Sequence, residues 1–163
     1  RSDNVEKILF KGCFPLNPAT VFAVMSLSEK IAQNERTLFT FLTDDDVYSL
    51  KHFINNSKNQ ELFNVDRIYD YFYNILKKEN DDGVKEVWIK AENAISKTND
   101  LVEIAILKVI SIIYMINDFE NYPPSDTSIR LSLDINSELF DLKINNMFEK
   151  GIIKRKKSNN VRL

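Results

Sequence analysis

A chain of 163 residues, 44% of them hydrophobic, is long enough to bury a core in one large or two small domains. Its net charge of −2 excludes binding to polyanions through bulk charge, and its single cysteine, Cys13, excludes an internal disulfide. Only three glycines and four prolines interrupt the chain, so we expect helices joined by short connections.

We expect a cytoplasmic protein with no signal peptide and no contact with a membrane. The most apolar stretch, residues 101–116, contains Glu103 and Lys108 and is shorter than the roughly 20 residues that cross a bilayer. A lone cysteine fits a reducing compartment. Because the sequence begins Arg1-Ser2 without methionine, we also expect a fragment of a longer protein.

Residues 1–98 are predicted to form a helical module. Asn17-Pro18 indicates a helix start, because asparagine caps a helix and proline suits its first position. Apolar residues then recur at helical spacing on both sides of a polar block, residues 33–37. They are Val21, Val24, Met25, Ile31 and Ala32 before the block, and Leu38, Phe41 and Leu42 after it.

Three further helices are expected in this half, opening at residues 43–46, after Asn64 and near residue 84. The first begins with three acids, which complement the positive end of a helix dipole. Asn64 is expected to cap the second. The expected inward residues are Val47, Leu50 and Ile54 in the first helix and Val65, Ile68, Tyr69, Phe72, Ile75 and Leu76 in the second.

Residues 99–163 are predicted to form a winged-helix domain. The expected elements are a buried helix over 101–117, a short helix over 126–133, a third helix from Asn136 or Ser137, and strands over 152–157 and 161–163. Gly151 ends the third helix at the usual C-cap position. The expected fold class is therefore mainly α, a helical bundle followed by a winged-helix domain with a small C-terminal β-hairpin.

Two segments resemble parts of large bacterial P-loop ATPases of the AAA+ or STAND kind, some of which are tied to phage defence. Residues 14–18, Phe-Pro-Leu-Asn-Pro, together with residues 33–42 resemble a block that follows the nucleotide-binding core, with Asn17 where that block usually has His. Residues 107–110 and 148–153 resemble the winged helix further along such proteins. Together the two segments cover about half of the chain.

The resemblance implies a parent protein that binds ATP and Mg²⁺, with an upstream P-loop domain as the partner of this segment. The chain itself has no G-x-x-x-x-G-K-[ST] loop, since its three glycines stand at positions 12, 83 and 151. We therefore expect no cofactor in this segment and no ATP hydrolysis by it alone.

The polar block holds the candidates for nucleotide sensing and domain contact. Arg36 is the candidate sensor, because an arginine on a lid helix can reach the terminal phosphates of ATP. The alternative is that Arg36 pairs with Glu35 or with a neighbouring helix end. Gln33, Asn34 and Glu35 are candidates for a domain interface, and Asn34 is also a candidate helix cap.

Basic and amide side chains near the C-terminus are candidates for nucleic-acid contact. They are Lys143, Asn145 and Asn146 on the third helix of this half, and Lys154, Arg155, Lys156, Lys157 and Arg162 on the hairpin. A basic hairpin can grip phosphates, whereas Glu138, Asp141 and Glu149 on the same helix would repel them. Contact with nucleic acid and contact with protein both stay open.

Other reactive side chains lack the neighbours that a catalytic or metal site needs. The acids at residues 44–46 are consecutive and do not converge on one point in a helix. His52 is the only histidine, and Cys13 has no histidine near it. The aromatic residues 69–73 are expected to pack in the core or at an interface rather than to stack on bases.

The sequence thus predicts a non-catalytic regulatory fragment of a larger ATPase, which couples nucleotide state to nucleic-acid or protein binding through a winged helix. The alternative is a freestanding winged-helix transcriptional regulator that binds DNA and dimerises through its N-terminal helices. An enzyme in its own right is disfavoured, because no set of residues has catalytic spacing.

Overall fold

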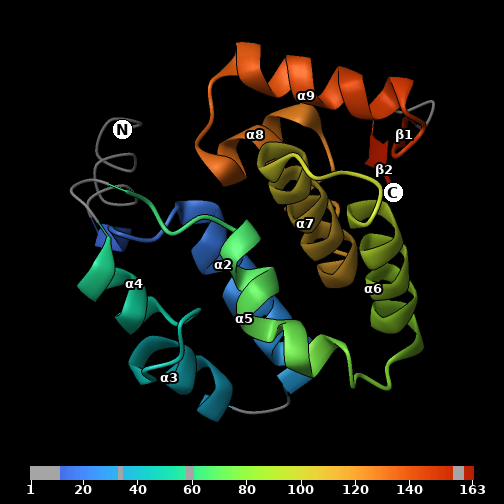
Figure 1. Cartoon of the computed structure of the whole chain (residues 1–163). Coiled ribbons are helices and arrows are strands. Elements are labelled where there is room, and N and C mark those ends of the chain that lie inside the picture. The colour runs from blue at the N-terminus through green and yellow to red at the C-terminus, as the bar shows by residue number, and fades with distance from the viewer. Residues whose placement is uncertain (1–11, 33–34, 58–60, 156–159) are drawn as a thin grey trace.

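Helices make up most of the molecule, and two short strands close its C-terminal end (Figure 1). The computed structural model describes residues 12–32, 35–57, 61–155 and 160–163. The helices are α2 (Pro18–Leu27), a π-helical turn η1 (Ser28–Ala32), α3 (Glu35–Thr43), α4 (Leu50–Asn56), α5 (Asp66–Leu76), α6 (Asp82–Ile95), α7 (Leu101–Ile116), α8 (Asp126–Leu133) and α9 (Ser137–Glu149). Strands β1 (Lys154–Arg155) and β2 (Val161–Arg162) pair antiparallel. The expected mainly α fold with a C-terminal hairpin is confirmed.

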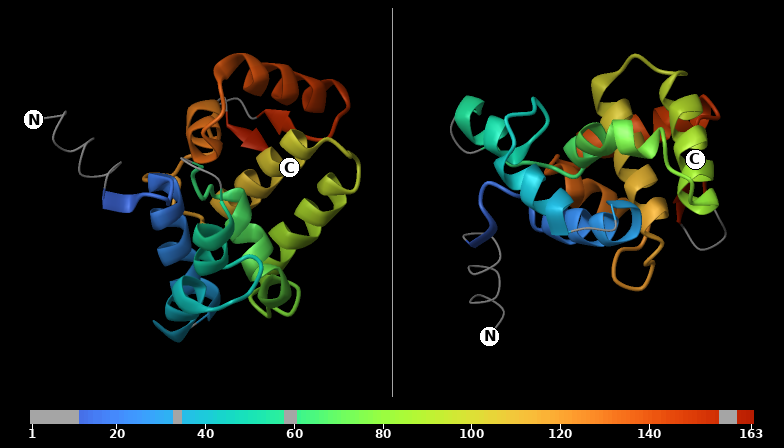
Figure 2. Two further views of the ribbon diagram at one scale, coloured as in Figure 1. Left: turned by 60° about the vertical axis from the view of Figure 1, so that its left-hand side comes forward. Right: turned by 90° about the horizontal axis from the view of Figure 1, so that it is seen from below.

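Helix α7 is the centre of the packing. It contacts α2, α5, α6, α8 and α9, and most of its apolar residues are buried. Lys108, on the part of α7 that faces α5, donates to Asp70 Oδ1 at 2.6 Å. Figure 2 shows α3 and α4 at one end of the molecule and α9 with the hairpin at the other.

One hydrophobic core runs through both predicted domains. Its buried residues extend from Ala23 in α2 to Val161 in β2. The boundary predicted near residue 98 falls between α6 and α7, two helices that pack along each other. Burial of apolar surface along that pair therefore joins the two halves of the chain.

A buried asparagine ties the start of α2 to the end of α8. Asn17, which is 4% exposed, caps α2 by accepting a hydrogen bond from the Ala19 amide at 3.0 Å. Its Nδ2 donates to Asn64 Oδ1 at 3.0 Å and to the Leu131 carbonyl at 2.8 Å. The predicted helix start at Asn17-Pro18 is confirmed, and the same side chain links segments more than a hundred residues apart in the chain.

Backbone contacts reinforce this junction. Leu16 and Phe63 form a parallel bridge, and the Val65 amide donates to the Ser132 carbonyl at 3.2 Å. Asn64 does not cap α5 as expected: its Nδ2 donates to the Leu133 carbonyl at 2.9 Å, and Val65 holds the N-cap position without a side-chain hydrogen bond. The asparagine is used to join α5 to α8 instead, because the last carbonyls of α8 need donors.

The expectation of a helix that opens at residues 43–46 is wrong. Thr43 is the last residue of α3, and residues 44–46 lie in the connection between α3 and α4. Helix α4 is capped by Ser49, whose Oγ accepts from the His52 amide at 3.2 Å. Leu50 is buried as expected, but Val47 and Ile54 are exposed. Met25, Leu42 and Ile75, also expected to face the core, are exposed as well. Ser49 is the better cap because its short hydroxyl reaches the free amide of the first turn.

The aromatic residues of α5 are used within the molecule. Tyr69 and Phe72 are buried, and the Tyr69 and Tyr73 hydroxyls donate to the two carboxylate oxygens of Glu92 on α6, at 2.7 and 3.1 Å. Burial, followed by the Glu92 carboxylate, raises the pKa of Tyr69, and Glu92 raises the pKa of Tyr73. Tyr71 donates to Thr40 Oγ1 at 3.3 Å. Internal packing therefore accounts for this aromatic group.

Replacing Asn17 with alanine should lower the free energy of unfolding by about 2–4 kcal/mol, because the substitution removes a cap and leaves buried partners without a donor. Asn136→Ala is the matched control: it removes the N-cap of α9 at an exposed position and should cost about 1 kcal/mol. Urea denaturation measures both. Equal losses in the two variants would contradict a joining role for Asn17.

Candidate functional site: the α9 face and the C-terminal hairpin

The last three helices and the hairpin follow the element order of a winged helix. Ser125 caps α8 and Asn136 caps α9, each accepting from a backbone amide of the first turn. Asp134 turns the chain between them in a left-handed conformation, φ 50°. Gly151 has φ 65° directly after α9, as expected for a helix-ending glycine. In the predicted winged helix, α9 would be the recognition helix.

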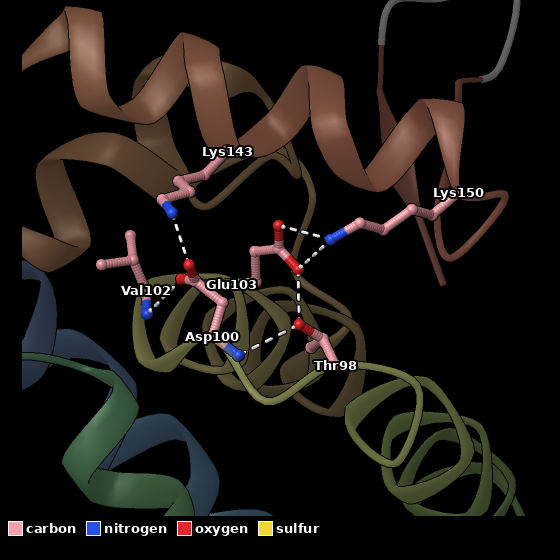
Figure 3. A network of polar contacts seen from close by, with 6 residues as sticks. All are labelled: Thr98, Asp100, Val102, Glu103, Lys143 and Lys150. Atoms are coloured by element: carbon pink, nitrogen blue, oxygen red, sulfur yellow. Dashed lines mark hydrogen bonds and ion pairs between the residues drawn. The ribbon is translucent and has the colours of Figure 1, made fainter.

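The lysines of this helix region turn inward to the start of α7 (Figure 3). Lys143 forms an ion pair with Asp100, the N-cap of α7, and Lys150 forms one with Glu103 at 3.2 Å. Glu103 is only 1% exposed and also accepts from Thr98 Oγ1 at 2.5 Å. These contacts join α9 to α7. Lys143 is largely covered by its pair, with 19% of its side chain exposed, whereas half of the Lys150 side chain stays exposed at the end of the helix.

Asp100 is held as a carboxylate. Its pKa is lowered, first by the hydrogen bond from Lys143 and next by the backbone amide of Glu103. Because Asp100 accepts from two amides of the first turn of α7, its negative charge also complements the helix dipole. The pair therefore stabilises the helix start and the position of α9 together.

The outward face of α9 is acidic. The exposed positions of α9 after its first residue are Glu138, Asp141, Leu142, Asn145 and Glu149. Every residue of α9 is described, and its only cation is the inward Lys143. A phosphate backbone would meet three carboxylates and no positive charge on this face, which opposes docking of α9 on DNA.

The hairpin is pinned to the helices behind it. The Tyr114 hydroxyl of α7 donates to the Val161 carbonyl at 2.9 Å, and the Val161 amide donates to the Pro124 carbonyl at 2.9 Å. Arg155 reaches Asp126 with two hydrogen bonds of 2.8 and 3.1 Å, and its guanidinium lies 4.7 Å from the centre of the Phe148 ring. Arg155 thus serves as an internal clamp between β1, α8 and α9.

The remaining basic candidates that the structure describes, Lys154 and Arg162, are register partners and lie on the same face of the hairpin. Both are exposed, but Arg162 lines a pocket shared with α6 and η1. Asn145 is exposed and Asn146 is half-buried. Lys156 and Lys157 lie outside the described residues.

The candidates of the polar block are only partly described. Glu35 and Arg36 are the first two residues of α3, but their side chains, with Gln33 and Asn34, lie outside what the structure describes. Nucleotide sensing by Arg36 and domain contact through the other three stay predictions.

Within the described ranges, no three His, Cys, Asp or Glu side chains lie where they could share a metal ion. His52 lies on α4, and Cys13 is a half-buried free thiol. No helix of the described part of the chain combines the length and apolar character needed to cross a bilayer.

A pocket that brings cations together was missed by sequence reasoning. Lys30 of η1, Lys90 of α6 and Arg162 of β2 line it. They lie far apart in the chain and belong to no motif, so only the packing of these elements brings them together.

Comparisons with protein-family models, with curated protein sequences and with solved structures found no match to this chain. The functional argument therefore depends on the residues and on their geometry.

Lys143→Met should raise the pKa of Asp100 toward its ordinary value of about 3.9, because it removes the main group that stabilises the carboxylate. A lowered folded-state pKa gives stability that is present above about pH 3.9 and is lost as pH falls through the folded pKa. The variant should therefore lose about 1 kcal/mol near pH 7 and less at lower pH. NMR titration of the Asp100 carboxyl and urea denaturation at several pH values measure these changes.

The control for this experiment is Lys154→Met, which removes a lysine from an exposed position of β1. It should leave the Asp100 titration unchanged. An Asp100 pKa that does not move in Lys143→Met would show that the ion pair does not form in solution.

Proposed function

We propose that this chain is a non-catalytic regulatory module whose winged helix binds a protein partner through the outward face of α9. In this proposal the module belongs to a larger P-loop ATPase and passes the nucleotide state of that protein to the partner. The choice of a protein partner over DNA rests on one observation, the inward ion pair between Lys143 and Asp100.

The charges of α9 favour protein over DNA. DNA-reading helices place lysine, arginine and amide side chains against phosphates and base edges. Here the exposed amide Asn145 stands among Glu138, Asp141 and Glu149. Rim acids of this kind steer a basic protein surface toward the face and repel nucleic acid.

An apolar side chain marks the middle of the same face. Leu142 is 57% exposed, beside the inward Lys143. Apolar residues inside a polar rim are the usual composition of a protein contact. This arrangement supports a basic partner with an apolar residue of its own.

The ATPase part of the proposal is supported by the sequence resemblance and by the surface near the polar block. Phe39 of α3 is 65% exposed and Val47, after the same helix, is 66% exposed. Large apolar side chains at one end of a molecule are typical of a surface that another domain covers. The coding sequence tests this part: a P-loop upstream of Arg1 in the same polypeptide supports it, and an initiator methionine directly before Arg1 contradicts it.

The rival function is a freestanding DNA-binding regulator, and the exposed Lys154 favours it. Binding to a 20-base-pair duplex across a salt series separates the two functions. We expect a dissociation constant no tighter than about 100 μM at 150 mM salt, the weak end of non-specific binding. Micromolar binding with a steep salt dependence that Lys154→Ala weakens would favour the regulator instead.

A charge-reversal variant tests whether α9 is the face that rejects DNA. Glu138→Lys, Asp141→Lys and Glu149→Lys together should bind the duplex at least about tenfold more tightly than the parent, with a steeper salt dependence. The control reverses three exposed acids outside α9, Glu29, Glu61 and Glu120, so it has the same net charge. An equal gain in the control would show that bulk charge, and not the α9 face, decides DNA binding.

A photo-crosslinking amino acid at Leu142 tests protein contact directly. In the cells that make this protein, we expect a discrete protein adduct from position 142 and none from Ile89, a similarly exposed position on α6. Adducts to nucleic acid from position 142, or identical adducts from both positions, would contradict the proposed function.

A further inference from the structure

A pocket lies where η1, α6, the C-terminal end of α7 and β2 meet. Its volume is about 290 Å³, just below the range of about 300–1,000 Å³ for small-molecule sites. Four separate elements build it, so its shape depends on the whole fold rather than on one loop. It lies apart from the outward face of α9.

The pocket carries an excess of positive charge. The side chains of Lys30, Lys90 and Arg162 line it, against one acidic side chain, that of Glu86; Leu163 lines it as well. Glu86 is paired with Lys90 at 2.5 Å, so that pair is close to neutral. Lys30 and Arg162 form no ion pair with a described side chain.

The donors of these two side chains are largely unused. Among the residues that the structure describes, Lys30 Nζ reaches only the Ile116 carbonyl, at the long distance of 3.5 Å. The Arg162 guanidinium makes no hydrogen bond or ion pair within the described residues, although its charge helps to lower the pKa of Glu86 after the larger effect of Lys90. An arginine fork with free donors is suited to a planar carboxylate or a phosphate.

The rest of the wall is apolar. Val87 of α6, Met115 of α7 and Phe119 line the pocket. Tyr114 also lines it and packs edge-to-face against Phe119, with ring centres 5.3 Å apart. The Tyr114 hydroxyl is already used on the Val161 carbonyl, so the tyrosine offers its ring rather than a polar group.

We propose that this pocket binds a small amphipathic anion, a molecule with an apolar body and one carboxylate or phosphate head. Arg162 and Lys30 hold the head, and the body lies against Val87, Met115 and Phe119. Bound there, the molecule bridges the N-terminal half of the chain, through η1, to the C-terminal hairpin. This site is independent of the partner proposed for α9.

Titration of the ¹⁵N-labelled chain with 4-phenylbutyrate, followed by NMR, tests the site. We expect saturable shifts at the amides of Gly83, Val87 and Asn117, with a dissociation constant in the millimolar range that suits a ligand of this size. Phenyl phosphate forms a second arm and distinguishes a phosphate head from a carboxylate head. The uncharged 4-phenylbutanamide should bind at least about fivefold more weakly, since it keeps the body and loses the charge.

Two substitutions test the cations. Arg162→Gln and Lys30→Gln should each weaken binding of 4-phenylbutyrate at least about fivefold, while Arg162→Lys keeps part of the affinity. Lys154→Gln is the control, because Lys154 opposes Arg162 on the hairpin but does not line the pocket. The dispersion of the amide spectrum shows that each variant is folded.

Three results would each overturn the site: equal affinity for the acid and the amide, unchanged affinity in Arg162→Gln, or shifts that never saturate and spread over the surface.

Discussion

Two ion pairs at the start of α7 decide which face of α9 the molecule presents. Lys143 pairs with Asp100 and Lys150 pairs with Glu103, so the one cation within α9, Lys143, is used inside the fold. The side that remains outward carries acids around Leu142. Glu103 is almost fully buried, and a buried carboxylate without its lysine would be costly. The ion pairs that hold α9 against α7 therefore also leave an acidic surface on the exposed side of α9.

The same molecule offers a physical route between its ends. Asn17 and Asn64 hold the last carbonyls of α8 from the N-terminal half, and α7 packs against helices of both halves. The hairpin in turn is fastened through Tyr114. A displacement of η1 or α2 would therefore be transmitted to α8 and the hairpin through packed and hydrogen-bonded groups, which are contacts of the kind that can carry coupling between sites.

Much of the fold could be predicted from local signals, and the errors have local causes too. Asn17-Pro18, Asn136 and Gly151 act through neighbours one to four residues away, so their caps follow from sequence. Asn64 has the same capping chemistry, but its side chain is used 69 residues away. The acids of α9 were visible in the sequence; the inward direction of Lys143 was not, because Asp100 lies 43 residues before it. Local sequence propensity cannot predict pairings between residues that lie so far apart in the chain.

The reactivity of Lys143 toward an amine-acylating reagent is the most direct measure of the central claim. Competitive acetylation of the folded chain, read by mass spectrometry, gives the rate for each lysine. The account predicts that Lys143 is acetylated much more slowly than the exposed Lys154. It also predicts that Asp100→Asn raises the acetylation rate of Lys143 and leaves that of Lys154 unchanged. Lys143 reacting as fast as Lys154 in the unmodified protein would contradict the account, because a free lysine on α9 would then be available to a phosphate.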